Sequence, residues 1–183
     1  MEIVLDKVKV LFSAEQIQDR VSALAKQISS DYKYSTNLVI IGVLKGAFIF
    51  TSDLVRHLTV PCQIEFIRLS SYHEGTTSSG KVKAYDLTLP PLDGKDVLIV
   101  EDIVDSGRTA KFLLDFLRAQ SSAKTIRLAS LVDKPCRRAS ELEYIKPDYC
   151  CFTIDDKFIL GYGLDYEQNF RELPYIGFVD GLA

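Results

Sequence analysis

Two adjacent carboxylates followed by a short polar turn stand near the middle of the chain. The aliphatic residues 97–100 lead into Glu101 and Asp102, and residues 105–109 then have the sequence Asp-Ser-Gly-Arg-Thr. A turn that opens a helix presents unpaired backbone N–H groups and the positive end of the helix dipole, which together stabilise a phosphate. Gly107 would let the backbone come close to such a ligand. The pattern therefore favours a phosphate site beside two acids, at the sheet edge where ligands of open α/β folds bind.

A plainer interpretation of these residues stays open on spacing alone. Asp-Ser-Gly is a frequent turn, and paired acids ahead of a helix can serve only as a solvated N-cap. Spacing favours the phosphate site without excluding the plain turn, so the choice depends on the longer stretch in which the turn lies.

That longer stretch resembles the phosphoribosyl pyrophosphate signature of the type I phosphoribosyltransferases. In the signature a hydrophobic strand leads to two acids, two aliphatic residues and then Asp-Ser/Thr-Gly-x-Thr, and residues 97–109 fill every position. The resemblance implies that Glu101 and Asp102 hold the ribose hydroxyls, directly or through magnesium. It also implies that Asp105 is the general base or acid near N7 of a purine. The residues that it assigns to the 5-phosphate are Asp105, Ser106, Gly107, Arg108 and Thr109, with Arg108 at a variable position.

Two cationic residues lie in segments similar to those that bind pyrophosphate in the 6-oxopurine branch of that family. Leu44-Lys45-Gly46 follows an aliphatic stretch and resembles the branch's pyrophosphate loop, in which a cis peptide bond is expected between Leu44 and Lys45. Arg171 matches the arginine that meets the pyrophosphate, a bidentate task that suits a guanidinium group. Taken alone, Lys45 could equally flank a helix, and Arg171 could lie on the surface.

Lys134 follows immediately on a predicted strand and resembles the branch's purine-recognising lysine. An ammonium group only donates hydrogen bonds, so it selects a 6-oxo group over a 6-amino group. Without the resemblance, Lys134 would be interpreted as an exposed surface lysine, which is the usual place of this residue type. Arg137 and Arg138, just beyond it, are expected to be surface or interface charges.

Residues 156–166 are close to the purine-and-metal segment of the same branch. The resemblance implies that Phe158 stacks on the base and that the Ile159 backbone bonds the base edge. It also implies that Asp165 joins the purine site and binds magnesium, an ion that suits oxygen ligands and a diphosphate leaving group. The plainer interpretation makes Phe158 an ordinary core residue.

The stretch between Ser70 and Lys83 collects glycine, serine and threonine without apolar periodicity, which predicts a mobile loop. It carries Ser71 and Tyr72, which resemble the pair that closes over the reaction in this branch and would exclude water. His73 could invite a catalytic role, but the branch does not require one, and a solvent-facing loop histidine is the simpler interpretation.

Hydrophobic periodicity places these residues in an alternation of helices and strands. Helices are predicted over residues 14–29, 47–58 and 109–119, the first from the capping-box sequence of residues 13–16. Strands are predicted over residues 38–43, 63–69, 96–100, 125–132 and 149–154, with a polar turn over residues 101–108. The alternation indicates an α/β fold with a mostly parallel sheet of about five strands, covered by helices on both faces. The resemblance implies the type I phosphoribosyltransferase fold with a small hood subdomain.

One domain is expected over residues 1–183, because 183 residues that are 47% hydrophobic suffice for one substantial core. The hood is expected to form from the N-terminal segment and the chain after about residue 134. No repeat, low-complexity tract or linker divides the sequence.

Composition argues against several classes of protein. The formal net charge is −3, from 22 basic and 25 acidic residues, which suggests neither a nucleic-acid partner nor a membrane surface. The N-terminus lacks a signal-peptide pattern, and no apolar run approaches the ~20 residues of a membrane helix, so a cytoplasmic protein is expected. The four cysteines and two histidines lack the spacing of a zinc site.

The resemblance extends over about residues 3–177. It implies transfer of the phosphoribosyl group from phosphoribosyl pyrophosphate to a 6-oxopurine, hypoxanthine and guanine among them, with Mg²⁺ as cofactor and a homodimer or homotetramer as the assembly. A phosphoribosyltransferase for another base is one alternative, which the residues after Val132 would discriminate. A regulator that binds phosphoribosyl pyrophosphate without catalysis is another, because one fold can serve several functions. The chain lacks the basic face that such a regulator needs for nucleic acid.

Overall fold

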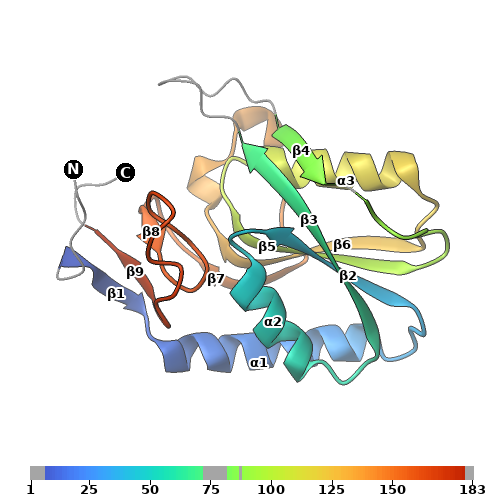
Figure 1. The fold of residues 1–183 in the computed structure, drawn as a ribbon, viewed down its shortest axis with the longest axis horizontal. Coiled ribbons are helices and arrows are strands. Elements are labelled where there is room, and N and C mark those ends of the chain that lie inside the picture. Colours follow the sequence, from blue (N-terminus) through green and yellow to red (C-terminus); the bar gives the residue numbers. More distant parts are fainter. Residues whose placement is uncertain (1–6, 72–81, 87, 180–183) are drawn as a thin grey trace.

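The computed structural model describes residues 7–71, 82–86 and 88–179, which form two sheets and three α-helices (Figure 1). The larger sheet has the strand order β4-β3-β2-β5-β6-β7. The five neighbouring strands β3, β2, β5, β6 and β7 run parallel to one another, and β4 pairs antiparallel with β3 at one edge. The strands are β2 (Leu38–Leu44), β3 (Cys62–Ser71), β4 (Val82–Asp86), β5 (Asp96–Val104), β6 (Thr125–Asp133) and β7 (Tyr149–Thr153). The predicted α/β fold with a central parallel sheet is confirmed.

Strands β2 and β5 lie at the centre of the sheet and are apolar along most of their length. Residues 38–43 and 96–101 are buried throughout. A strand with helices on both faces must bury both sets of side chains, which explains a continuous aliphatic run in place of alternation. The two strands pair in register from Leu38 with Asp96 to Gly42 with Val100, so their carboxyl ends meet at one edge of the sheet.

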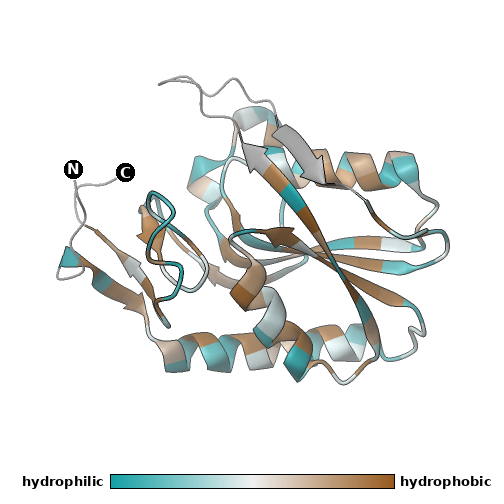
Figure 2. Cartoon of the chain, in the orientation of Figure 1, coloured by the Kyte–Doolittle hydropathy of each residue, from teal (hydrophilic) through white to brown (hydrophobic). Residues whose placement is uncertain are grey.

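Helices α1 (Ala14–Asp31) and α2 (Phe48–His57) cover one face of the sheet, and α3 (Arg108–Gln120) covers the other (Figure 1). The predicted capping box is confirmed: Gln16 N–H donates to Ser13 Oγ at 3.2 Å, and Ser13 N–H donates to Gln16 Oε1 at 2.9 Å. Hydrophobic residues gather in the central strands, and hydrophilic residues mark many connecting loops (Figure 2). None of the helices in the described part of the chain is both long and apolar enough to cross a membrane.

The smaller sheet joins segments from the two ends of the chain. It consists of β1 (Lys9–Phe12), β8 (Ile159–Leu160) and β9 (Ile176–Phe178), in the order β1-β9-β8. The rings of Phe12 and Phe152 stack with 3.9 Å between their centres, which links β1 to strand β7 of the larger sheet. This is the region where a hood is expected. Strand β7 follows residue 134 in the chain but belongs to the larger sheet, so the hood does not take all of the chain beyond that residue.

Strand β5 is longer than predicted. The polar turn expected over residues 101–108 is wrong for residues 101–104, which continue the strand. Ile103 and Val104 pair with residues of β6, and Val104 is only 2% exposed. The aliphatic pair after the two acids has enough apolar surface to extend the ladder, so the turn is confined to the residues that precede α3.

The loop predicted between Ser70 and Lys83 is also shorter than expected. Strand β3 continues through Ser71, and the antiparallel partner β4 begins at Val82. Short helical turns over Pro135–Arg137 and Ser140–Leu142 complete the connection from β6 to β7. Tyr72, His73 and the rest of the predicted loop up to residue 81 lie outside the described residues.

Candidate active site

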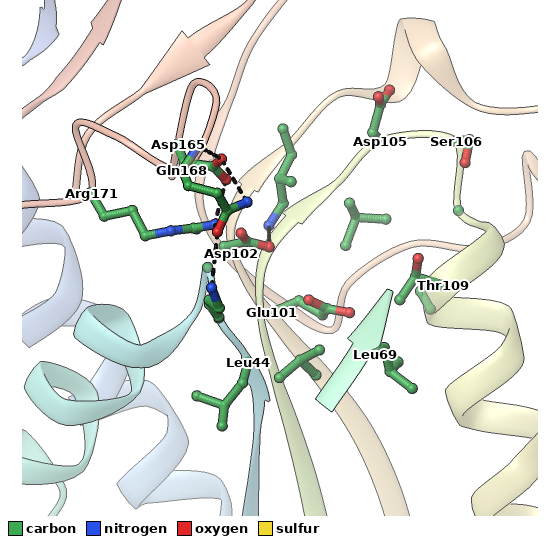
Figure 3. A pocket seen from close by; sticks show the side chains of 17 residues that line it. Leu44, Leu69, Glu101, Asp102, Asp105, Ser106, Thr109, Asp165, Gln168 and Arg171 are labelled. Atoms are coloured by element: carbon green, nitrogen blue, oxygen red, sulfur yellow. Dashed lines mark hydrogen bonds and ion pairs between the residues drawn. The ribbon is translucent and has the colours of Figure 1, made fainter. Parts of the chain in front are cut away.

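A cavity of about 540 Å³ opens at the carboxyl ends of β2 and β5 (Figure 3). This is the edge at which open α/β sheets bind their ligands. The predicted site residues that line it are Leu44, Lys45, Gly46, Glu101, Asp102, Asp105, Ser106, Gly107, Thr109, Asp165 and Arg171. The lining residues that were not predicted are Val43, Leu69, Ile103, Val104, Ala110 and Gln168.

The turn after β5 forms one end of the cavity and leads directly into α3. Gly107 is the N-cap of the helix, with φ +84°, a left-handed conformation that glycine adopts without strain. Within the described residues no side chain caps this end from the N-cap position. The first N–H groups of α3 and the positive end of its dipole therefore face the cavity, where Ser106 and Thr109 also lie (Figure 3). The arrangement suits a phosphate group.

Glu101 and Asp102 lie between this turn and the segment after β2 (Figure 3). Glu101 is 4% exposed, and its Oε1 has no hydrogen-bond partner among the described residues. Burial and the adjacent Asp102 carboxylate raise the pKa of Glu101 well above its usual range. Burial also raises the pKa of Asp102 to about 6, although the N–H of Ile103 donates to its carboxylate at 2.7 Å. The pKa of Asp102 is raised even though the positive charge of Arg171 acts to lower it, so this part of the cavity favours a further cation.

Gly46 brings the segment after β2 into contact with Asp102. A Cβ atom on Gly46 would lie 1.5 Å from Oδ2 of Asp102. Gly163 also lies close to this segment, since a Cβ atom there would lie 2.1 Å from the carbonyl oxygen of Gly46. The peptide bond between Leu44 and Lys45 is cis, as predicted.

Arg171 and Gln168 lie at the other end of the cavity (Figure 3), and the lining residue Lys45 bonds this glutamine. The Lys45 ammonium donates to Oε1 of Gln168 at 2.9 Å, and the Arg171 guanidinium donates to the same oxygen at 3.4 Å. Arg171 also pairs with Asp165 at 2.6 Å and donates to the carbonyl oxygen of Gly163 at 2.7 Å. Two cations that converge on one oxygen could together bind an anion with several oxygens, such as pyrophosphate.

The other predicted purine residues do not line this cavity. Lys134 is only 6% exposed, and its ammonium donates to the carbonyl oxygen of Lys157, so it is not a surface lysine. Phe158 is half-buried and meets the ring of Tyr166 edge-on, with 5.7 Å between ring centres. Ile159 begins β8 and is buried. The structure therefore places these residues together near Lys157, beside the cavity and not within its lining.

Three other predicted site residues remain, Arg108, Ser71 and Tyr72. Arg108 begins α3 and pairs with Glu141 at 3.6 Å, outside the cavity lining. Ser71 ends strand β3, and Tyr72 lies outside the described residues. The role predicted for Ser71 and Tyr72 in closing the site stays a prediction.

The sequence analysis missed the positions of two polar residues, one of which lines the cavity. Gln168 is one, and its position between Asp165 and Arg171 was its only signal. Arg138 is the other, and the expectation of a surface or interface charge is wrong for it. Its side chain is 4% exposed and is bonded to the carboxylate of Asp133 and to backbone. Arg137, by contrast, is half-exposed.

Comparison with known proteins gives the family. The phosphoribosyl transferase domain matches residues 8–167, which is most of the chain. The chain belongs to this family. Among curated phosphoribosyltransferases, the hypoxanthine-guanine phosphoribosyltransferase of Streptococcus pyogenes is 43% identical over 169 residues, which are 92% of this chain and 91% of the relative. The protein of the same name from Streptococcus pneumoniae is 41% identical over the same shares.

Solved phosphoribosyltransferase structures share the fold. A hypoxanthine phosphoribosyltransferase from Staphylococcus aureus has a TM-score of 0.87 and 38% identity, over 95% of this chain and 92% of that chain. A hypoxanthine-guanine phosphoribosyltransferase from Bacillus anthracis has a TM-score of 0.85 and 41% identity, over 93% of this chain and 98% of that chain. The expected type I phosphoribosyltransferase fold is thereby confirmed.

Proposed function

We propose that the chain transfers the 5-phosphoribosyl group from phosphoribosyl pyrophosphate to hypoxanthine or guanine, giving IMP or GMP and pyrophosphate, in purine salvage in the cytoplasm. The observation that carries the proposal is the arrangement of charge along the cavity. A helix N-terminus stands at one end, two cations stand at the other, and acids lie between them. Phosphoribosyl pyrophosphate has the complementary pattern, since anionic groups flank a ribose that carries hydroxyls.

A divalent cation fits beside Glu101, Asp102 and Asp165. Phosphoribosyltransferases of this kind generally need such an ion. A buried, unbonded Oε1 on Glu101 and a raised pKa on Asp102 are both features that a cation would relieve. Mg²⁺ suits such a site, because it keeps several waters and is commonly shared between a few carboxylates and substrate phosphates. When bound, it would neutralise charge on the diphosphate leaving group.

The acids and the cations would act at different steps of the reaction. Departure of pyrophosphate leaves positive charge on the ribose, which the carboxylates of Glu101 and Asp102 would stabilise. Asp105 would take the proton from the purine near N7. Its Oδ1 lies 3.5 Å from the Arg137 guanidinium and accepts no hydrogen bond within the described part of the chain, so it can accept one from the base. Lys45 would hold the leaving pyrophosphate.

The base would lie against the segment that follows β7. The Lys134 ammonium offers three donors, of which the Lys157 carbonyl oxygen takes one. A remaining donor would bond O6 of the purine. Phe158 would stack on the ring, and the backbone of Ile159 would meet its edge. This arrangement selects 6-oxopurines over adenine, whose 6-amino group presents donors.

A homodimer or homotetramer is the proposed assembly. Phe48 on α2 is 41% exposed, and Ile64 and Phe66 on β3 are 43% and 44% exposed. Apolar side chains on adjoining elements favour contact with a second copy. Sedimentation of the wild type and of Phe66→Glu would test this, with a shift to monomer expected for the variant.

The activity itself is tested with four bases. Hypoxanthine, guanine, xanthine and adenine are each incubated with phosphoribosyl pyrophosphate and Mg²⁺, and nucleotide formation is followed spectrophotometrically. Turnover with at least one 6-oxopurine and none with adenine is expected, and chelation of the metal should stop it. Absence of turnover with every 6-oxopurine would overturn the proposed function.

A further inference from the structure

The buried guanidinium of Arg138 lies behind the turn that follows β5. It donates to the carbonyl oxygen of Val104 at 2.9 Å and also to that of Asp105. Its other terminal nitrogen pairs with the carboxylate of Asp133, whose side chain is 10% exposed. A charge held this deeply is costly unless it is paired and hydrogen-bonded, and these contacts provide that pairing.

Backbone N–H groups from the segment after β6 also donate to carbonyl groups of this turn. The N–H of Lys134 donates to the carbonyl oxygen of Val104 at 3.0 Å, and the N–H of Ala139 donates to that of Ser106 at 3.1 Å. Together with the guanidinium, these donors bond three consecutive carbonyl groups, those of residues 104, 105 and 106. The turn is thus held by one short segment that also carries the predicted purine lysine.

The stem of Arg138 also packs against the turn itself. A Cβ atom on Gly107 would lie 2.8 Å from Cδ of Arg138. Arg138 is absent from the lining of the cavity, whereas the turn residues from Asp105 to Gly107 are part of it. The arginine and the cavity therefore lie on different sides of this backbone.

The hydrogen bonds to the carbonyl groups of the turn also fix the direction of the backbone N–H groups that follow them. The peptide unit is planar, and in a trans unit the N–H points opposite to the carbonyl oxygen. The peptide bonds of the turn are trans, since among the described residues only the Leu44–Lys45 bond is cis. A carbonyl bonded to Arg138 thus directs the N–H of the next residue, Asp105 or Ser106, away from the arginine.

We propose that Arg138 is a positioning residue that aims the backbone amides of the turn at the 5-phosphate of the nucleotide. Through Asp133 it also ties the turn to the strand end that precedes Lys134. The proposal rests on the proposed function, because it concerns the phosphate of that enzyme's substrate and product. Arg138 itself touches neither.

The test compares two ligands that differ only in the 5-phosphate, IMP and inosine. Affinities for both are measured by calorimetry on the wild type and on Arg138→Lys. Lysine keeps the charge but has one nitrogen where the guanidinium uses two, one for the two carbonyl groups and one for Asp133. IMP affinity should fall by about ten- to a hundred-fold, whereas inosine affinity should change by less than about three-fold. The KM for phosphoribosyl pyrophosphate should rise in parallel.

Two further variants separate positioning from general damage. Arg20 is the matched control, because its guanidinium donates to two successive carbonyl oxygens of β7, at 2.9 Å and 3.5 Å, away from the cavity. Arg20→Lys should leave both affinities unchanged. The double variant Arg138→Gln with Asp133→Asn removes both buried charges together, so neither is left unpaired. It should fold and show the same selective loss for IMP.

Each outcome bears on one hypothesis. Equal losses for IMP and inosine would mean general damage and would overturn the positioning role. Unchanged IMP affinity in both folded Arg138 variants would overturn it as well. Wild-type protein that forms no IMP from hypoxanthine would instead overturn the proposed function.

Discussion

The two ends of the cavity are built in different ways. At the turn, the ligand-facing groups are backbone amides whose carbonyl groups are bonded to the segment after β6. At the cationic end, the groups are side chains of Lys45 and Arg171, which already bond Gln168 and Asp165. The first end can accept an anion without rearrangement, whereas the second must exchange one set of partners for another. Under the proposed function, the fixed end would bind the phosphate that stays on the sugar, and the exchangeable contacts would bind the pyrophosphate that leaves.

The largest effect is expected at Asp105, within the fixed end. Asp105→Asn should lower kcat by roughly 10²- to 10⁴-fold as proton transfer is lost. Binding of phosphoribosyl pyrophosphate should persist, because in the proposed site backbone amides would hold the phosphate. Steady-state kinetics and equilibrium binding would be measured together. Full turnover, or outright loss of binding, would show that Asp105 is not the base.

Substitution at the exchangeable end should act mainly on binding. Lys45→Met should raise the KM for phosphoribosyl pyrophosphate by about ten- to a hundred-fold, because one charge-assisted contact to pyrophosphate is lost. The KM for hypoxanthine should change little. Initial rates over both substrate concentrations would separate the two constants, and equal increases in both would contradict the assignment of Lys45 to pyrophosphate.

Lys134→Gln tests the proposed purine-binding role of Lys134, whose backbone N–H bonds the end of β5. Loss of a charge-assisted bond to O6 should lower kcat/KM for hypoxanthine by about ten- to a hundred-fold. Glutamine can also accept a bond from the 6-amino group of adenine, so the preference for oxopurines should narrow from both directions. The ratio of kcat/KM for the two bases is the measurement. An unchanged ratio would place Lys134 outside the purine pocket.

Asp102 should make the metal-free protein less stable as the pH rises. Burial raises its pKa to about 6 from 3.8, so the folded state holds the proton more tightly than the unfolded state. The contribution of protonated Asp102 to the free energy of unfolding is fully present below pH 4 and is lost as the pH rises through 6. Asp102→Asn should therefore stabilise the metal-free protein by about 1 to 2 kcal/mol at pH 7.5 and hardly at all at pH 3.5. Urea unfolding at both pH values would measure this, and an equal gain at both would exclude the pKa as the cause.

The smallest effect is expected at Gln168, whose Oε1 accepts hydrogen bonds from both Lys45 and Arg171. Gln168→Ala removes this competing acceptor, so pyrophosphate affinity should rise by about two- to five-fold. Calorimetric titration with pyrophosphate and Mg²⁺ would show it, with Glu167→Ala, its exposed neighbour, as the control. A loss of affinity would mean that Gln168 helps to bind the ligand.

Local patterns were enough to predict the central strands, the first helix and most of the cavity lining. The strand at residues 38–43 is a continuous aliphatic run, and the residues from 97 to 109 match a long signature, so both carry their information in neighbouring residues. The end of β5 was misjudged because two acids interrupt it, although Ile103 and Val104 still pair with β6.

Positions that depend on distant partners were beyond sequence reasoning. Arg137 and Arg138 are adjacent and chemically identical, yet one is half-exposed and the other is buried against the turn after β5. Only the tertiary fold brings the carbonyl groups of Val104 and Asp105 to the second of them. Gln168 was missed for the same reason, since its partner Lys45 follows β2 and is remote in the chain.

The contact between Gly46, Asp102 and Gly163 sets a limit on which sequences can encode this protein. At both glycines a Cβ atom would overlap an oxygen atom of the neighbouring segment. In a saturation library, any replacement at Gly46 would press the loop after β2 against Asp102 of β5. Any replacement at Gly163 would push the chain between β8 and β9 away from the loop after β2, and so part the two sheets. Lys45, which is exposed, should accept many replacements that still fold. Selection for folded protein alone would therefore keep both glycines and leave the neighbouring lysine free to vary.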